Sequence, residues 1–202
     1  MAVEDLTRLE AVNIIIGTIG LSPVSTLVSP GRDVAIAESI LDECTRNTLA
    51  EGWDWNTEDD YPLSPNASNE ILWPTNAATL RKSRDEVTDE ARYVRRNGKV
   101  YDKVERSFTF TEALEVYLVL YLEWDDIPHA ARNYITICAA RKYSNRFVGS
   151  REIDGFTRND ELYARSLLMD EEARTAEYSI WDNYSTARPL YRTQGSIRYY
   201  NR

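Results

Sequence analysis

Hydrophobic residues recur at helical spacing near both ends of this chain, and the segment between those ends lacks that spacing. Four segments carry the pattern: residues 5–19, 33–51, 128–148 and 153–178. Each has a single apolar stripe, and such a stripe is stable only when another element covers it. Because the two outer pairs can bury their stripes only on one another, the spacing predicts one four-helix bundle assembled from both ends of the chain.

Glycine and proline set the expected ends of these helices. Gly20, Gly52 and Gly149 each follow an apolar stripe, where glycine commonly ends a helix. Pro128 suits the first turn of the third helix. In the fourth helix we expect these residues to face inward: Phe156, Tyr163, Leu167 and Leu168. We expect its acids on the opposite face: Asp160, Glu161, Asp170, Glu171 and Glu172.

The middle of the chain, residues 53–124, favours short strands over helices. Pro62, Pro65 and Pro74 interrupt any helix there. Strand-like segments occur at residues 52–56, 70–73, 91–95 and 115–124, and the last of these is apolar enough to be covered on both faces. Asn97-Gly98 separates two strand-like runs and predicts a tight hairpin turn, which needs positive φ at both residues.

The expected fold class is therefore mainly α with a β insertion, an α+β arrangement. Residues 1–52 and 125–182 are assigned to the helical bundle, and residues 53–124 to a small antiparallel β subdomain. Residues 183–202 show no periodicity, so we expect an extended C-terminal tail.

Charge and hydropathy narrow the classes of function. The net charge is −9, and an acidic protein does not grip DNA by neutralising phosphates. It can still surround DNA without binding it, although acidity is often no more than an aid to solubility. The apolar runs at residues 11–16 and 116–122 fall short of the roughly 20 residues that cross a bilayer, so we expect no membrane association.

The residues that commonly carry catalysis or bind metals are scarce. The chain has two cysteines, Cys44 and Cys138, and a single histidine, His129. This set cannot supply the four ligands of a usual zinc site without carboxylates, so we expect no metal, no cofactor and two buried, reduced thiols. At the start of a helix, His129 is more typical of a surface or capping residue than of a catalytic base.

An acidic loop offers the one plausible catalytic cluster. Glu58, Asp59 and Asp60 follow Trp53 and Trp55, and paired carboxylates beside aromatic platforms can hydrolyse glycans. A solvated acidic loop has the same composition. A glycan hydrolase therefore stays an alternative function.

The C-terminal tail combines arginine and tyrosine without any acid. Both residue types make good interface anchors, so we expect a docking arm, with a partner-free tail as the alternative. The tail residues proposed for contacts are Tyr184, Arg188, Tyr191, Arg192, Arg198, Tyr199 and Tyr200. The arginines of the tail also leave DNA binding as an alternative function, although the net negative charge of the chain argues against it.

Several stretches resemble the tail tubular protein A family of short-tailed bacteriophages. At the N-terminal end these are residues 11–20 (AVNIIIGTIG) and 22–27 (SPVSTL), followed by residues 46–53. Further along come residues 98–102 (GKVYD), 125–128 (DDIP), 139–142 (AARK) and 145–149 (NRFVG), then Glu152. The matches keep one order and span most of the chain, whereas residues 61–90 and the C-terminal tail match poorly.

The resemblance implies a structural virion protein and not an enzyme. Members of this family join the portal to the tail as a ring of about twelve copies, whose interfaces are heterologous. The implied partners are further copies of the chain, the portal protein and a tail nozzle of the tail tubular protein B type. Genomic DNA is expected to pass through the central channel without specific binding, and the location is the virion tail, assembled in the host cytoplasm. The acidic face of the last helix then lines the channel or faces the exterior, and both alternatives stay open.

The best-matching segment supplies further candidate contacts. Arg141, Arg146 and Glu152 lie near the end of the third predicted helix and the start of the fourth. We expect them to form structural ion pairs or contacts between subunits, and a solvated helix end is the alternative.

Overall fold

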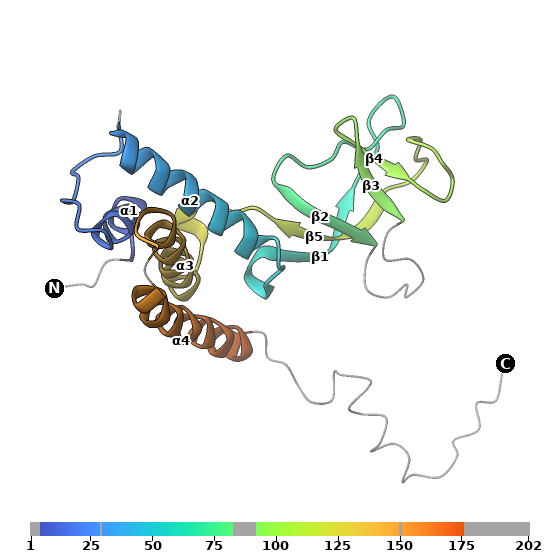
Figure 1. Cartoon of the computed structure of the whole chain (residues 1–202). Coiled ribbons are helices and arrows are strands. Elements are labelled where there is room, and N and C mark those ends of the chain that lie inside the picture. The colour runs from blue at the N-terminus through green and yellow to red at the C-terminus, as the bar shows by residue number, and fades with distance from the viewer. Residues whose placement is uncertain (1–4, 29, 83–91, 150, 176–202) are drawn as a thin grey trace, which may run out of the picture.

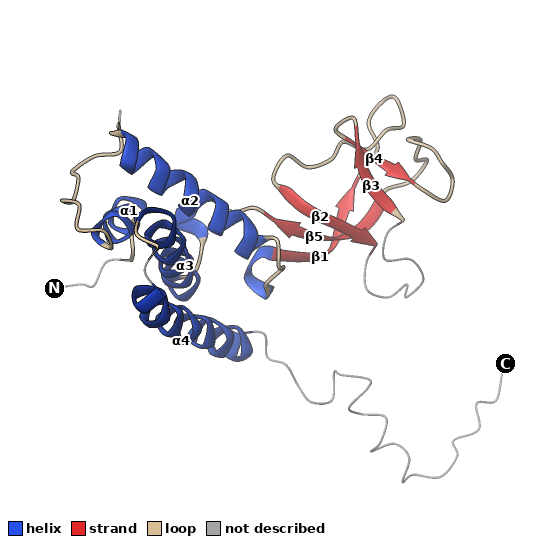
Figure 2. Ribbon diagram, viewed as in Figure 1, coloured by secondary structure: helices blue, strands red, loops and turns tan. Residues whose placement is uncertain are grey.

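The computed structural model describes residues 5–28, 30–82, 92–149 and 151–175. Within them the chain forms four α-helices: α1 (Arg8–Gly17), α2 (Arg32–Leu49), α3 (His129–Phe147) and α4 (Arg151–Thr175). Its strands are β1 (Thr57–Leu63), β2 (Ala77–Lys82), β3 (Tyr93–Arg96), β4 (Lys99–Asp102) and β5 (Leu114–Leu120). Figure 2 shows the helices gathered on one side of the molecule and the strands on the other, which confirms the predicted α+β class.

Helix α3 holds the bundle together. Helices α1, α2 and α4 each pack against it, and in Figure 1 α1 and α2 lie above α3 while α4 lies below. One continuous core takes side chains from all four, including Val12 of α1, Leu41 of α2, Ile135 of α3 and Leu168 of α4. The predicted bundle from both ends of the chain is therefore confirmed.

Capping contacts explain where the helices begin and end. The Thr7 hydroxyl accepts from the Glu10 N–H at 3.2 Å, and the Glu10 carboxylate accepts from the Thr7 N–H at 2.9 Å. This reciprocal capping box starts α1 at Arg8, three residues later than residue 5. Gly20 and Gly149 have φ values of 79° and 65°, as expected of glycines that follow a helix end.

The inward face of α4 differs from the prediction. Tyr163 and Leu167 are 67% and 41% exposed, while Ala164 and Leu168 are both 1% exposed. Glu161, expected to point outward, is half-buried in contact with α3. The helix is rotated because its charged side chains bind Arg141, Glu51 and a backbone N–H of the rest of the chain. Polar contacts, and not the largest apolar residues, therefore set its orientation.

The β region is built around strand β5. It lies between β1 and β2 in an antiparallel sheet, and β3 and β4 form a separate antiparallel pair. A second hydrophobic core lies within this region: Leu63, Ile71, Trp73, Ala77, Leu80, Tyr93, Val100, Val116 and Leu118. One face of the sheet carries the apolar side chains that form this core, and the outer side of β1 faces solvent.

The predicted hairpin at Asn97-Gly98 is confirmed. The two residues have φ values of 51° and 71°, and Arg96 pairs with Lys99 across the turn. Positive φ at both positions is what a two-residue hairpin turn needs, because it matches the twist of the flanking strands.

Other strand predictions were wrong. Residues 52–56 contain a short 3-10 helix, Asp54–Asn56, and not a strand. The strand expected at residues 115–124 ends at Leu120, and a second 3-10 helix follows at Trp124–Asp126. Both tryptophan-bearing segments bend away from the sheet because Trp53 and Trp124 are buried in the helical core.

The sequence also gave no sign of β1 and β2. Strand β1 contains Glu58, Asp59 and Asp60, so the predicted acidic loop is wrong. As an edge strand it tolerates acids on its solvent side, and Pro62, which cannot donate to a neighbouring strand, fits there too. The irregular register between Glu58 and Tyr61, with positive φ at Asp60, hides the alternation that marks a strand.

The domain boundaries predicted from sequence stay a prediction, as does the role of the C-terminal tail. Residues 183–202 lie outside the described residues.

Candidate functional site

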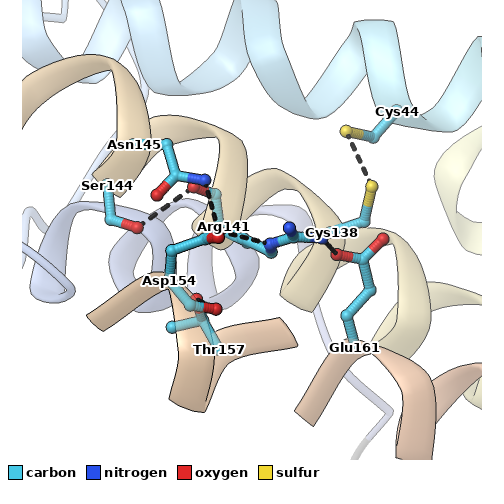
Figure 3. A network of polar contacts seen from close by, with 8 residues as sticks. All are labelled: Cys44, Cys138, Arg141, Ser144, Asn145, Asp154, Thr157 and Glu161. Atoms are coloured by element: carbon cyan, nitrogen blue, oxygen red, sulfur yellow. Dashed lines mark hydrogen bonds and ion pairs between the residues drawn. The ribbon is translucent and has the colours of Figure 1, made fainter. Parts of the chain in front are cut away.

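Arg141 lies at the centre of a polar network between α3 and α4 (Figure 3). Its Nε donates to Asp154 Oδ1 at 2.8 Å, and its Nη1 donates to Glu161 Oε2 at 2.8 Å. Asn145 Nδ2 donates to the same Asp154 oxygen at 2.7 Å. One guanidinium thus binds two carboxylates about two turns apart on α4, a task that suits the fixed fork of arginine.

The network shifts the acidity of its members. Hydrogen bonds to Asp154 and then to Glu161 raise the pKa of Arg141 above its ordinary value. Hydrogen bonds from Arg141 and then Asn145 lower the pKa of Asp154. Arg141 and Asp154 therefore stay ionised at neutral pH, and their charge-assisted hydrogen bond holds α4 against α3.

A second cluster joins α3 to α2. Arg146 Nη2 lies 3.1 Å from Glu43 Oε2, and Lys142 Nζ lies 3.3 Å from Glu43 Oε1. Hydrogen bonds from Arg146 first, and then Lys142, lower the pKa of Glu43. Because these side chains are partly exposed, each pair contributes little stability alone.

A third cluster fastens α4 to the end of α2. Arg165 forms hydrogen bonds with both carboxylate oxygens of Glu51, and its guanidinium lies 4.7 Å from the ring centre of Trp53 and 5.1 Å from that of Tyr134. The Asp54 N–H donates to Glu172 Oε1 at 2.6 Å. The inward side of α4 thus contacts the rest of the chain through cation–π interactions and ion pairs.

The outward side of α4 carries large apolar side chains. Leu162 and Met169 are 59% and 55% exposed, and they lie seven residues apart, so they share one flank of the helix. Tyr163 and Leu167 lie four residues apart on the other flank. A helix that leaves several large apolar side chains exposed presents the kind of surface that partner proteins cover.

The predicted contact residues fall into three groups. Arg141 and Arg146 bind carboxylates of the same chain, as described above. Glu152 lies in the first turn of α4, and nothing is described of its side chain. The remaining seven lie in the C-terminal tail, outside the described residues. A role for any of these residues at a subunit interface stays a prediction.

Glu43, Glu51 and Arg165 lie at the same helix contacts, although the sequence did not indicate them. The predicted outward orientation of Glu161 was wrong. Helical spacing held a signal for that residue, since Asp154 and Glu161 lie seven residues apart and must share one side of α4.

The two cysteines are free, as expected, but they are not equally buried. Cys44 is 1% exposed, whereas Cys138 is half-buried on the neighbouring helix. His129 is exposed at the start of α3, with its Nδ1 3.6 Å from Asp5 Oδ1. Among the residues that the structure describes, no cluster of His, Cys, Asp and Glu could hold a metal ion.

Glu58, Asp59 and Asp60 do not form a catalytic cleft. All three are exposed along the edge strand β1. In the part of the chain that is described, no helix is both long and apolar enough to cross a membrane.

Comparisons with known proteins agree with this arrangement. A family model described as "Tube: Tail tubular protein" matches residues 9–178, which include nearly all of the bundle and the β region. The chain is also 25% identical over 175 residues to the tail tubular protein A of Klebsiella phage KP34, covering 86% of this chain and 91% of that protein. The chain therefore belongs to the tail tubular protein family and is a structural component of a bacteriophage tail.

Proposed function

We propose that this protein is the adaptor that joins the portal to the tail nozzle, as a ring with the DNA channel at its centre and about twelve copies around it. The proposal extends the family assignment, which covers most of the chain. The proposed role is structural and not catalytic, in keeping with the family, and the acids Glu58, Asp59 and Asp60 lie exposed along the edge strand β1.

The exposed apolar side of α4 is the single observation that best supports the formation of a ring. A heterologous ring needs two different faces on each subunit, one for each neighbour. Leu162 and Met169 would lose contact with water in such a contact, and burial of apolar surface is the main driving force of association. The same flanks are ill suited to line a DNA channel, so we infer that this side of α4 faces a protein.

A hollow on α1 is the candidate for the second face. It has a volume of about 530 Å³ and is lined by Leu6, Glu10, Asn13, Ile14 and His129. Ile14 is 48% exposed although it belongs to a helix of the bundle. An apolar side chain from the α4 of the next subunit would fit a hollow with this mixture of apolar and polar lining.

Overall charge supports passage of DNA without binding. The chain carries 33 acidic and 24 basic side chains, so its long-range field repels phosphates. Asp160, Asp170 and Glu171 are exposed on α4, whereas Glu161 and Glu172 bind groups within the chain. The acidic face is therefore smaller than the sequence indicates, and acids elsewhere in the ring would contribute to the channel wall.

The double substitution Leu162→Lys with Met169→Lys tests the subunit contact. We expect it to abolish ring formation on the portal of the same phage in sedimentation experiments, with an unchanged circular dichroism spectrum. Val104→Lys is the matched control, because Val104 is 56% exposed in the β region. Rings that form normally with the double variant would overturn the role of α4.

We further propose that residues 183–202 dock on the portal. Their arginines and tyrosines suit an acidic, partly apolar surface. Truncation after Asp182 should leave the melting temperature nearly unchanged and weaken binding to portal rings. A truncated chain that unfolds, or that binds portals with full affinity, contradicts this role.

A further inference from the structure

Cys44 and Cys138 face each other across the contact between α2 and α3 (Figure 3). Their sulfur atoms are 3.5 Å apart and share a hydrogen bond. The two residues are 94 positions apart in the chain, and the whole β region lies between them. They meet because each cysteine lies on the apolar stripe that its helix presents to the other helix.

Charged neighbours distinguish the two thiols. The hydrogen bond from Cys138 lowers the pKa of Cys44, and the nearby Lys142 ammonium lowers it further, although burial opposes both. The same hydrogen bond, together with burial, raises the pKa of Cys138. The pair therefore loses its first proton from Cys44, and Cys138 keeps its proton to donate to that thiolate.

We propose that Cys44 and Cys138 form a redox-active pair, which hydrogen peroxide converts to a disulfide between α2 and α3. The sulfurs need to approach by about 1.5 Å to reach the bonding distance of about 2.05 Å. Side-chain rotation supplies movements of that size, and both sulfurs already point toward each other (Figure 3).

The reaction proceeds in two balanced steps. The Cys44 thiolate attacks one oxygen of hydrogen peroxide, the O–O bond breaks, and a sulfenic acid and hydroxide form. The Cys138 thiol then attacks the Cys44 sulfur, the S–OH bond breaks, and water leaves with the Cys138 proton. Both thiols are oxidised, the peroxide is reduced to two water molecules, and the hydroxide takes up the proton first released from Cys44. Hydrogen peroxide is small enough to reach a thiol that is 1% exposed, whereas bulky oxidants are not.

The bond would link α2 covalently to α3 within the helical bundle. It would join the helix that precedes the β region to the helix that follows it, closing a long loop in the unfolded chain. If the protein acts in the virion tail, the thiols stay reduced during assembly in the cell and oxidise after release into an oxidising medium. This timing rests on the proposed function, but the chemistry of the pair does not.

The test uses the purified full chain, treated with hydrogen peroxide and then denatured. We expect reactive thiols to fall from two to none, with loss of the mass of two hydrogen atoms and full reversal by dithiothreitol. The melting temperature should rise by roughly 5–15 °C. Cys44→Ser and Cys138→Ser are matched controls, and neither should show that rise.

Three outcomes would overturn the proposal. They are retention of both thiols in the folded wild-type chain, addition of oxygen atoms without a crosslink, and disulfides only between separate chains. All are read on the wild type, so they do not depend on the folding of a variant. Ring assembly on the portal is measured separately, so a failure of the proposed function is distinguishable from a failure of this chemistry.

Discussion

The side-chain amide of Asn56 donates to the Leu120 carbonyl at 2.9 Å, joining the point where the chain enters the β region to the point where it leaves. The same nitrogen donates to the Leu49 carbonyl at 2.8 Å, and the Asn56 side-chain oxygen accepts from the Trp53 N–H at 2.6 Å. Asn56 is 2% exposed, so one buried amide satisfies three backbone groups at the junction between the bundle and the sheet.

Replacement of this amide should be costly. Asn56→Ala leaves buried backbone groups without partners, and we expect it to lower the free energy of unfolding by about 2–4 kcal/mol. Urea denaturation measures the loss. Asn47→Ala is the matched control, because Asn47 is exposed on α2 and alanine favours helices there. Equal stability of the two variants would show that the junction does not depend on Asn56.

The hairpin turn predicts a smaller, conformational effect. Gly98 has a φ of 71°, and an added Cβ would meet no other atom, so Gly98→Ala should cost about 1 kcal/mol through backbone strain alone. Gly17→Ala is the control. Gly17 is the last residue of α1 and has open space around it, so alanine there should raise the stability of the protein. Thermal unfolding of both variants checks the prediction, which requires changes of opposite sign.

Asp102 makes stability depend on pH. It accepts from Arg92 Nε at 2.9 Å and from the Val104 N–H at 2.8 Å. Burial raises the pKa of Asp102, but these hydrogen bonds, with one from the Glu105 N–H, outweigh it and bring the pKa below the ordinary 3.8. The folded state thus binds this proton less readily than the unfolded state, so the stabilisation is complete above about pH 4 and disappears as the pH falls through the lowered pKa.

The variant Asp102→Asn should therefore lose about 1–3 kcal/mol at pH 7. The difference from wild type should shrink as the pH is lowered below the ordinary pKa of 3.8. Urea denaturation at several pH values measures it, and the exposed Glu105→Gln variant controls for general charge effects. A difference that stays constant down to the lowest pH would contradict the assigned role of the ionised carboxylate.

Arg141 should contribute through its geometry as well as its charge. Arg141→Gln removes both carboxylate contacts of α4, and we expect a loss of about 1 kcal/mol, the upper end for pairs that solvent reaches. Arg141→Lys should recover only part of it, because an ammonium cannot reproduce the two-carboxylate fork. Arg46→Gln is the control, because Arg46 is exposed on α2. Thermal unfolding in low and high salt tests this, and full rescue by lysine would argue against the fork.

Helical periodicity predicted the bundle well because each of the first three helices buries a stripe that it displays in its sequence. It failed for α4, where Arg165, Glu161 and Glu172 form the contacts with the bundle, since a charged residue that is paired in the fold looks solvent-exposed in a sequence. Strand β1 was not predicted because edge strands tolerate acids and proline, which are rare in other strands.

The candidate site could be predicted only in part from the sequence, because its charged residues are paired across two helices. Local spacing places Arg141 and Asn145 on one side of α3, but their partner Asp154 belongs to the next helix, whose rotation only the folded chain defines. The contact between Cys44 and Cys138 was hidden likewise, because periodicity identifies a buried face and not the residue that it meets.

Electron microscopy of the purified protein mixed with portal rings of the same phage tests the central claim most directly. We expect a second ring beneath the portal, with an open channel and the α4 helices at the contacts between neighbouring subunits. Single copies scattered on the portal, or no binding under conditions in which the portal binds its other partners, would contradict the assignment of this chain as the ring-forming adaptor.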